Sequence, residues 1–348
     1  MNLNQLVYFD EKYFTDETIS IGKNVWFCLG HASDFTEGFN IVKPWNFEVL
    51  FLKQENNFQA FLNVCPHRGL SFTSEDVCKE RFSIKCKYHG LQFGADGEAL
   101  KELYNFEKES KFKLQKMNVG LCGKFIYVSF QKKITVKEYL FEHFDILEKY
   151  SLSIGKKILI RNIEVGVNWK LQMENFLDCL HTLWVHHDTI GRRQKLKLGN
   201  DYLYKISGNT SSLYSAGSSL SESTLNVYTK RSPNRKFISG GYEHVHCFPN
   251  FNIATDQGFY FVNIVVLPVS VDKCTLNLSL YLPDGSEFSP SHVAYVEAAI
   301  MKIIGEDIAT VQNFNRGVSY LESNLQYSGL EERTEHFVKN CLKYKTKS

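Results

Sequence analysis

The chain has 348 residues, of which 43% are apolar and 22% are charged, as in ordinary globular proteins. Its formal net charge of +2 gives no reason to expect binding to nucleic acid or to a membrane surface. No run of eighteen apolar residues exists, so we expect no membrane span. Residues 1–14 lack a basic region followed by an apolar one, so we expect no signal peptide. The scattered cysteines indicate mainly reduced thiols and a cytoplasmic protein.

Short strands dominate the first half of the chain. β-Branched and aromatic residues recur in brief runs, and Asp96-Gly97 is typical of a hairpin turn. This pattern predicts a small all-β domain over residues 25–150, preceded by an N-terminal segment, residues 1–24, which we expect to pack on the second domain. The expected strands are 25–29, 48–53, 58–64, 91–93 and 124–130, followed by a polar, lysine-rich connection over 131–157.

The second half of the chain mixes strands with helices. Strands are predicted at 158–165, 259–266 and 274–282, the last with leucines on one face. Residues 169–187 are helical in pattern, and the Ser- and Gly-rich stretch 207–223 predicts a mobile loop. The fold class is therefore α+β, in which the small all-β domain is joined to a larger domain, residues 151–348, of antiparallel sheet plus helices.

Two short pairs, Cys65-Pro66-His67 and Cys86-Lys87-Tyr88-His89, lie within the strand-rich region. Two Cys with two His is the ligand set of a Rieske [2Fe–2S] centre, in which thiolates hold one iron and imidazoles the other. Four such residues also hold structural zinc, but zinc motifs usually group like ligands together. Each pair here contributes one Cys and one His, which favours a dinuclear cluster held between two loops.

The segments 63–69 and 86–90 resemble the two cluster-binding loops of the Rieske ring-hydroxylating oxygenases. Both segments end in glycine, which lets backbone N–H groups approach the sulfides of a cluster. The chain departs from the family pattern at Leu91, where the oxygenases usually have Trp. The resemblance implies that the cluster ligands are Cys65, His67, Cys86 and His89.

A second set of candidate ligands lies in residues 168–187. A metalloprotease places two His at i and i+4 so that both meet one ion. His181 and His186 are five residues apart, which separates them by about 140° on a regular helix. If they share a metal, the helix must distort or end between them. The alternative is two ordinary helix histidines.

The residues Asn168-Trp169-Lys170, Glu174-Asn175, Asp178, His181 and His186 resemble, in this order, the mononuclear iron segment of Rieske non-haem iron oxygenases. The resemblance covers nearly the whole chain, since cluster loops, iron segment and a late helix follow in the family's order. It implies that His181, His186 and one distant carboxylate form the facial triad of an Fe(II) that activates oxygen.

The distant carboxylate is sought on the amphipathic helix predicted over 291–314. Asp307 falls on its apolar stripe, where a carboxylate is costly unless it is paired or bound to metal. Glu306 points about 100° away, toward the edge of the stripe. The family also takes its ligand from an acidic pair on this helix, so Asp307 is the expected third ligand. The alternative is a salt bridge of Asp307 to Arg316 or Lys302. Weaker candidates for the ligand are Asp188 and Glu174.

Asp178 precedes His181 by three residues, so both lie on one helical face. Similar oxygenases use this acid as a bridge between an iron-ligand His and a cluster-ligand His of the neighbouring subunit. The alternative is that Asp178 orients His181 alone. Asn175 is expected beside the iron.

No dinucleotide-binding or plant-type ferredoxin motif exists in the sequence. The resemblance therefore implies a terminal oxygenase component that takes electrons from a separate reductase, with or without a ferredoxin. It would use O2 to hydroxylate a small organic substrate, by aromatic ring hydroxylation or oxidative N- or O-demethylation, as a homotrimer. The alternative is a Rieske electron-transfer protein without oxygenase activity. Candidate pocket residues are Phe176, Leu177, Asn250, Asn252 and Phe314.

Overall fold

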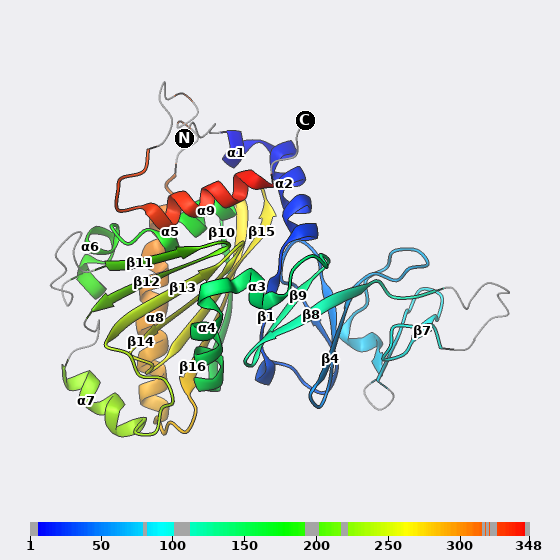
Figure 1. Cartoon of the computed structure of the whole chain (residues 1–348), viewed down its shortest axis with the longest axis horizontal. Coiled ribbons are helices and arrows are strands. Elements are labelled where there is room, and N and C mark those ends of the chain that lie inside the picture. Colours follow the sequence, from blue (N-terminus) through cyan, green and yellow to red (C-terminus); the bar gives the residue numbers. More distant parts are fainter. Residues whose placement is uncertain are drawn as a thin grey trace. The chain divides into compact units, whose positions relative to one another are not determined.

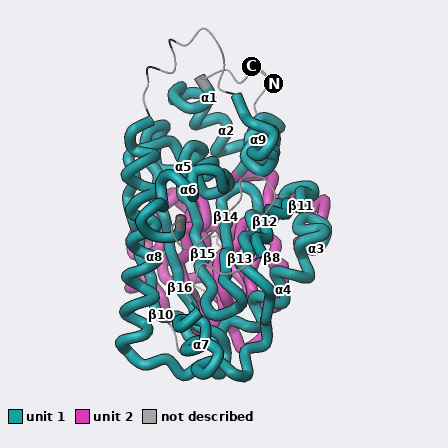
Figure 2. The backbone as a smooth tube through the Cα atoms, turned by 90° about the vertical axis from the view of Figure 1, so that its left-hand side faces the viewer, with its two compact units in different colours: residues 1–21, 137–348 teal, residues 22–136 magenta. Residues whose placement is uncertain are grey.

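A computed structural model describes residues 6–78, 82–100, 112–191, 202–216, 222–314, 317, 320 and 326–344. The chain divides into two units, drawn in different colours in Figure 2. The small unit is Gly22–Val136, and the large unit is Met1–Ile21 with Lys137–Ser348. The sequence predicts boundaries after residues 24 and 150. Within the described residues, no helix has the length and apolar character that a membrane span requires.

The small unit contains two antiparallel sheets. The larger one has the strand order β1-β9-β8-β4-β3-β2, and the smaller one has the order β5-β6-β7. Residues 49–52 of β3 form a continuous buried apolar run. The strands are β1 Phe27–His31, β2 Gly38–Val42, β3 Val49–Gln54, β4 Asn57–Leu62, β5 Val77–Cys78, β6 Ser83–Lys85, β7 Gln92–Phe93, β8 Lys116–Cys122 and β9 Phe125–Ser129.

The predicted Asp96-Gly97 turn is present after β7. Phe93 and Ala99 form an antiparallel bridge on either side of it. Gly97 has a φ of +80°, and a Cβ there would lie 2.4 Å from the ring of Phe61. Glycine is therefore required both by the backbone conformation and by the close approach to the core.

The large unit is built on an antiparallel sheet with the order β10-β16-β15-β14-β13-β12-β11. The predicted alternation is confirmed in β16, where Leu276, Leu278 and Leu280 are fully buried. The mixture of this sheet with helices confirms the α+β class. The strands are β10 Ile154–Val165, β11 Tyr202–Ser207, β12 Thr210–Ala216, β13 Gly241–Cys247, β14 Phe251–Asp256, β15 Phe261–Ser270 and β16 Lys273–Pro283.

Helices cover both faces and one end of this sheet (Figures 1 and 2). Helix α8 lies along one face, and α4 lies against the other, where Tyr150 of α4 donates a hydrogen bond to Glu243 of β13. Helices α5 and α9 contact each other at one end of the strands. The helices are α1 Leu6–Phe9, α2 Glu11–Asn24, α3 Val136–Leu140, α4 Phe144–Ser153, α5 Trp169–Leu177, α6 Thr182–Val185, α7 Glu222–Arg231, α8 Pro290–Val311 and α9 Glu332–Lys343.

Two predicted loops are wrong in part. The polar stretch 131–157 contains α3 and α4, and the stretch 207–223 contains β12 and the start of α7. Strand β12 pairs with β11 on one side and β13 on the other. This pairing gives the backbone N–H and C=O groups of a serine-rich segment hydrogen-bond partners, although serine has no strong intrinsic preference for strands. Ser211 and Ser215 are buried in this strand. Residues 217–221 of that prediction lie outside the described residues.

Candidate metal centres and an adjoining cavity

The two Cys-His segments of the small unit form matching loops. The N–H of Cys65 donates to the carbonyl of Leu70 at 2.8 Å, and the N–H of Cys86 donates to the carbonyl of Leu91 at 2.7 Å. Both cysteines are 2% exposed and belong to the core of the unit. Leu91, which replaces the family's usual Trp, packs against the same core. The two loops thus present their thiols from equivalent backbone positions.

A glycine closes each loop. Gly69 and Gly90 have φ values of +75° and +77°, and their N–H groups donate to the carbonyls of Cys65 and Cys86. Other residues rarely adopt this conformation, so glycine keeps both loops tight. The glycine at the end of each loop therefore has a direct backbone reason.

The donor atoms of these loops suit a [2Fe–2S] cluster. The ring centroids of His67 and His89 are 4.5 Å apart, and Nδ1 of His67 is buried without a hydrogen-bond partner in the described structure. Burial raises the pKa of the Cys65 thiol, while the backbone N–H groups of His67 and Arg68 act in the opposite direction and favour the thiolate. Ligation by iron would satisfy both the unpaired imidazole nitrogen and the buried thiolate.

In the large unit, the helical segment breaks where the ligand spacing requires it to. Helix α5 ends at Leu177, residues 178–181 leave the helix, and α6 follows for a single turn. His181 is the N-cap of α6 and His186 its C-cap. The predicted distortion between the two histidines is confirmed, since α6 ends at Val185 and a π-helical turn starts at His187.

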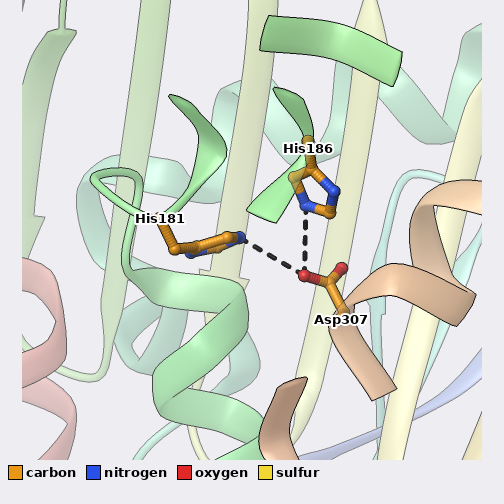
Figure 3. A group of neighbouring side chains, drawn as sticks. All are labelled: His181, His186 and Asp307. Atoms are coloured by element: carbon orange, nitrogen blue, oxygen red, sulfur yellow. Dashed lines mark ion pairs between the residues drawn. The ribbon is translucent and has the colours of Figure 1, made fainter. Parts of the chain in front are cut away.

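Asp307 of α8 completes a three-residue cluster with these histidines, shown in Figure 3. Its Oδ1 lies 3.3 Å from Nε2 of His181 and 3.1 Å from Nε2 of His186. One potential ligand atom from each residue lies within 4.8 Å of the others. Asp307 is buried, as its place on the apolar stripe predicts. Arg316, one alternative partner for Asp307, lies outside the described residues.

The pKa values follow from this packing. Burial alone would lower the pKa of His181, but its hydrogen bonds with Asp178 and Asp307 outweigh burial and raise the pKa to about 9. Burial alone would raise the pKa of Asp307. Its hydrogen bonds and charge interactions with His181 and His186 outweigh burial and lower that pKa. A carboxylate and two imidazoles converging here form the donor set of a facial triad, so the residues fit a mononuclear Fe(II).

A further carboxylate holds the outer nitrogen of each histidine. Asp178 Oδ2 is 3.3 Å from Nδ1 of His181, and Glu306 Oε2 is 2.8 Å from Nδ1 of His186. Each carboxylate supports a proton on Nδ1 of its histidine, so that a metal would replace the proton on Nε2 and bind there. Asn175 donates to Oδ1 of Asp307 at 3.2 Å. Each of the three residues of the cluster is therefore held by a further polar side chain.

A cavity of about 180 Å³ adjoins this cluster. His181, His186 and Asp307 all line it, and most of its remaining wall is apolar. A largely apolar lining suits an organic molecule. The apolar residues that line it include Phe176, Leu177, Ile190, Leu213, Ala254, Val262, Ile264, Ile300, Ile303 and Ile304.

Three of the five predicted pocket residues, Phe176, Leu177 and Asn252, line the cavity. Asn250 does not line it, because its amide donates to the carbonyl of Val266 and so supports the β13–β14 connection. Phe314 does not line it either, because it lies beyond the end of α8 with half of its side chain exposed.

Two residues beside the cluster are not predicted from the sequence. The helical pattern places Glu306 at the edge of the stripe and favours its neighbour Asp307 as the ligand. The adjacency of two acids is the signal that points to Glu306. Arg333 also lines the cavity, but it comes from α9, a helix that the sequence pattern does not predict. Only the tertiary structure brings α9 to this cavity.

Comparison with protein families gives two matches along the chain. Residues 25–107 match the Rieske [2Fe-2S] domain, and residues 155–346 match the ring hydroxylating alpha subunit (catalytic domain). The first match contains both Cys-His loops, and the second contains His181, His186 and Asp307.

Curated relatives of the chain include two kinds of oxygenase. The chain is 29% identical to the large oxygenase component of the naphthalene 1,2-dioxygenase system of Pseudomonas fluorescens, over 59% of this chain and 47% of the relative. It is 25% identical to the oxygenase subunit of carnitine monooxygenase from Acinetobacter pittii (strain PHEA-2), over 51% of this chain and 50% of the relative. The matched regions thus span about half of each relative.

Solved structures share the fold over almost the whole chain. The quaternary ammonium Rieske monooxygenase CntA in complex with L-carnitine superposes with a TM-score of 0.76 at 17% identity, covering 99% of this chain and 96% of that chain. Naphthalene 1,2-dioxygenase with bound indole gives a TM-score of 0.74 at 18% identity, covering 99% and 92%. With a catalytic-domain match over more than half of its length and a Rieske domain before it, the chain belongs to the Rieske ring-hydroxylating alpha subunits.

Proposed function

We propose that this protein is the terminal oxygenase component of a multicomponent Rieske oxygenase. It would take electrons from a separate reductase, with or without a ferredoxin, and use O2 to hydroxylate a small organic substrate. The reaction would be aromatic ring hydroxylation or oxidative N- or O-demethylation. The observation that carries the proposal is the His181, His186 and Asp307 cluster, which opens onto a largely apolar cavity.

The residues of the chain have separable roles in this proposal. Cys65, Cys86, His67 and His89 would hold the [2Fe–2S] cluster, and the buried triad would hold Fe(II). When bound, these groups supply electrons and activate O2. Asp178 and Glu306 would hold the protons of the two imidazoles on Nδ1, and the largely apolar wall of the cavity would receive the body of the substrate.

Asp178 is proposed to serve electron transfer between subunits. It lies against His181 with 22% of its side chain exposed, so one of its sides remains accessible. The structure of a quaternary ammonium Rieske monooxygenase, which shares this fold, gives insight into inter-subunit electron transfer in that protein. We therefore propose a homotrimer, in which Asp178 connects His181 to a cluster-ligand histidine of the neighbouring subunit.

A pure Rieske electron carrier is the rival function. It would leave the buried Asp307 and its two histidines, as well as the cavity, without a role. The content of iron in the purified protein separates the two functions, at about three irons per chain for the oxygenase and about two for the carrier.

Two variants, each of which removes a ligand of one metal site, extend this test. Cys65→Ala should remove the visible absorbance of the cluster and keep the mononuclear iron. Asp307→Ala should keep the absorbance and remove the third iron. O2 consumption with a reductase and a panel of small substrates should require both sites. Two irons per chain in the wild-type protein, with no further iron taken up on reconstitution, would favour the carrier.

A further inference from the structure

A buried arginine without a counter-charge lines the cavity that adjoins the triad. Arg333 of α9 is 1% exposed, and among the described residues no carboxylate forms an ion pair with its guanidinium. Its Nη2 is buried with no hydrogen-bond partner in the described structure. A buried cation is unfavourable unless an anion pairs with it, so the position calls for a partner from outside the described protein groups.

The carboxylates that line the cavity are already engaged elsewhere. Asp307 pairs with His181 and His186, and Asp178 accepts hydrogen bonds from the N–H of Leu180 and from His181. Neither carboxylate forms an ion pair with Arg333 in the described structure. The cavity lining thus carries acids around the histidines and a cation at Arg333.

Neutral groups fix the guanidinium in place. Nε donates to Ser211 Oγ at 3.3 Å, and Nη1 contacts Nδ1 of His244 at 3.4 Å. Burial and the charge of Arg333 hold the pKa of His244 well below its usual value, so this imidazole is neutral. Its Nδ1 accepts from Arg333, and its Nε2 donates to Asn252 Oδ1 at 3.2 Å.

The orientation of Arg333 is therefore set before any ligand arrives, while Nη2 remains unused. Burial also lowers the pKa of Arg333 to about 10, which still leaves it charged at neutral pH. A preorganised, desolvated guanidinium binds a carboxylate more strongly than an exposed one does, because little entropy or hydration remains to be lost.

We propose that the substrate of this oxygenase is a small organic monocarboxylate, whose carboxylate pairs with Arg333 and whose apolar body lies toward His181, His186 and Asp307. The proposal rests on the proposed oxygenase function and adds the class of its substrate. The cavity of about 180 Å³ suits this size, since a cavity of about 150 Å³ holds a benzene ring in another protein. Pairing at one end would fix which atoms of the substrate face the triad.

Binding of matched acids and amides tests the proposal. The probes are benzoate with benzamide and hexanoate with hexanamide, titrated calorimetrically into the iron-loaded enzyme without oxygen. The wild-type enzyme should bind the acid of at least one pair about tenfold more tightly than its amide, since a charge-assisted hydrogen bond is lost with the amide. Arg333→Met should abolish that preference and change amide binding by less than about twofold.

Control variants separate this role from a structural one. Arg161→Met removes an exposed arginine of β10 and should leave the preference for the acid intact. Arg333→Lys should keep part of it, because the charge remains without the forked donors. Arg333→Met should keep or raise the melting temperature, since it removes an unpaired buried cation, and the acid should stabilise the wild-type protein only.

Two outcomes would overturn the proposal. These are equal binding of acid and amide by the wild-type enzyme, or unchanged acid binding by Arg333→Met. Asp307→Ala should retain the preference for the acid. The binding experiment therefore tests the role of Arg333 separately, even if the measured iron content argues against the oxygenase function.

Discussion

At the scale of single residues, the triad depends on its own three side chains and also on the carboxylates that contact its two histidines. Glu306 accepts from Nδ1 of His186 at 2.8 Å and from the hydroxyl of Thr189 at 2.7 Å. The sequence places Glu306 off the buried stripe and predicts a small effect of its removal. The contact with His186 revises that expectation, because a held Nδ1 proton fixes both the tautomer and the ring.

Asp307→Ala should lose the mononuclear iron and turnover, while the [2Fe–2S] absorbance stays. Glu306→Ala should lower the affinity for Fe(II) by about 10- to 100-fold, since it removes the support of a ligand and leaves the three ligands in place. Titration of the iron-depleted protein with Fe(II) under nitrogen measures both. Wild-type iron affinity in Glu306→Ala would show that His186 needs no support from this acid.

Asp178→Asn should keep both iron sites and the proposed trimer, and yet slow the proposed transfer of the electron to the triad. The amide preserves the shape but loses the charge that orients and polarises the imidazole of His181. In a single turnover of pre-reduced enzyme with O2 and substrate, we expect reoxidation of the cluster to slow about 100-fold or more. Reduction by the partner should be unchanged. Fast reoxidation with full iron occupancy would reduce Asp178 to a support for His181.

At the scale of elements, α4 and the short turn before it attach to the sheet through a buried histidine. His143 is 1% exposed, and its Nδ1 and Nε2 lie 2.7 Å from Thr210 Oγ1 and 2.9 Å from Ser212 Oγ on β12. Thr210 already donates its hydroxyl proton to the carbonyl of Ser207, so it accepts from Nδ1. Nε2 then accepts from Ser212, and the imidazole is neutral.

This contact makes stability depend on pH. Burial, with smaller contributions from Lys205 and Arg333, lowers the pKa of His143 from 6.5 to about 4. Between pH 6.5 and 4 the unfolded chain binds a proton that the folded chain does not. The free energy of unfolding should therefore fall as the pH drops through this window, by up to about 3 kcal/mol.

Urea unfolding of the wild type and of His143→Gln at pH 7, 6, 5 and 4 measures this dependence. The variant loses two buried hydrogen bonds and should be less stable at pH 7 by about 1–3 kcal/mol. Its stability should then fall less steeply toward pH 4, because Gln does not titrate. Parallel pH profiles for the two proteins would assign the acid sensitivity to other groups.

At the scale of the whole molecule, the proposed route of the electron crosses between subunits. Cys65→Ala chains would have the mononuclear iron without the cluster, and Asp307→Ala chains would have the cluster without that iron. Neither protein should turn over by itself. In mixed trimers, a cluster of one subunit can face an iron of its neighbour, so activity should return.

Random mixing should restore about a quarter of the wild-type rate, since half of the donors and half of the acceptors at each interface are competent. The two variants are to be dissociated, mixed and reassembled, and the mixed assembly is to be verified by native mass spectrometry. Mixed trimers that remain inactive would place the electron route within one chain, or would show that the proposed assembly is wrong.

The sequence alone predicts the metal ligands of this protein where the residues that form a site lie close together along the chain. The Cys65 and Cys86 loops are predicted because ligand type, spacing and terminal glycine are all local. The five-residue spacing of His181 and His186 correctly requires a break in the helix. Asp307 is predicted as the third ligand because a carboxylate on an apolar helical stripe is costly unless a cation or a metal ion pairs with it.

Tertiary structure alone decides what lies around those residues. Glu306 meets His186, Arg333 enters the cavity, and Asn250 turns away to hold a backbone carbonyl, although no local pattern distinguishes these outcomes. The serine-rich β12 is a strand because it has partners on both sides. Each of these features depends on which distant segment of the chain supplies a hydrogen-bond partner or lines the cavity. The chemical character of the cavity follows from that packing.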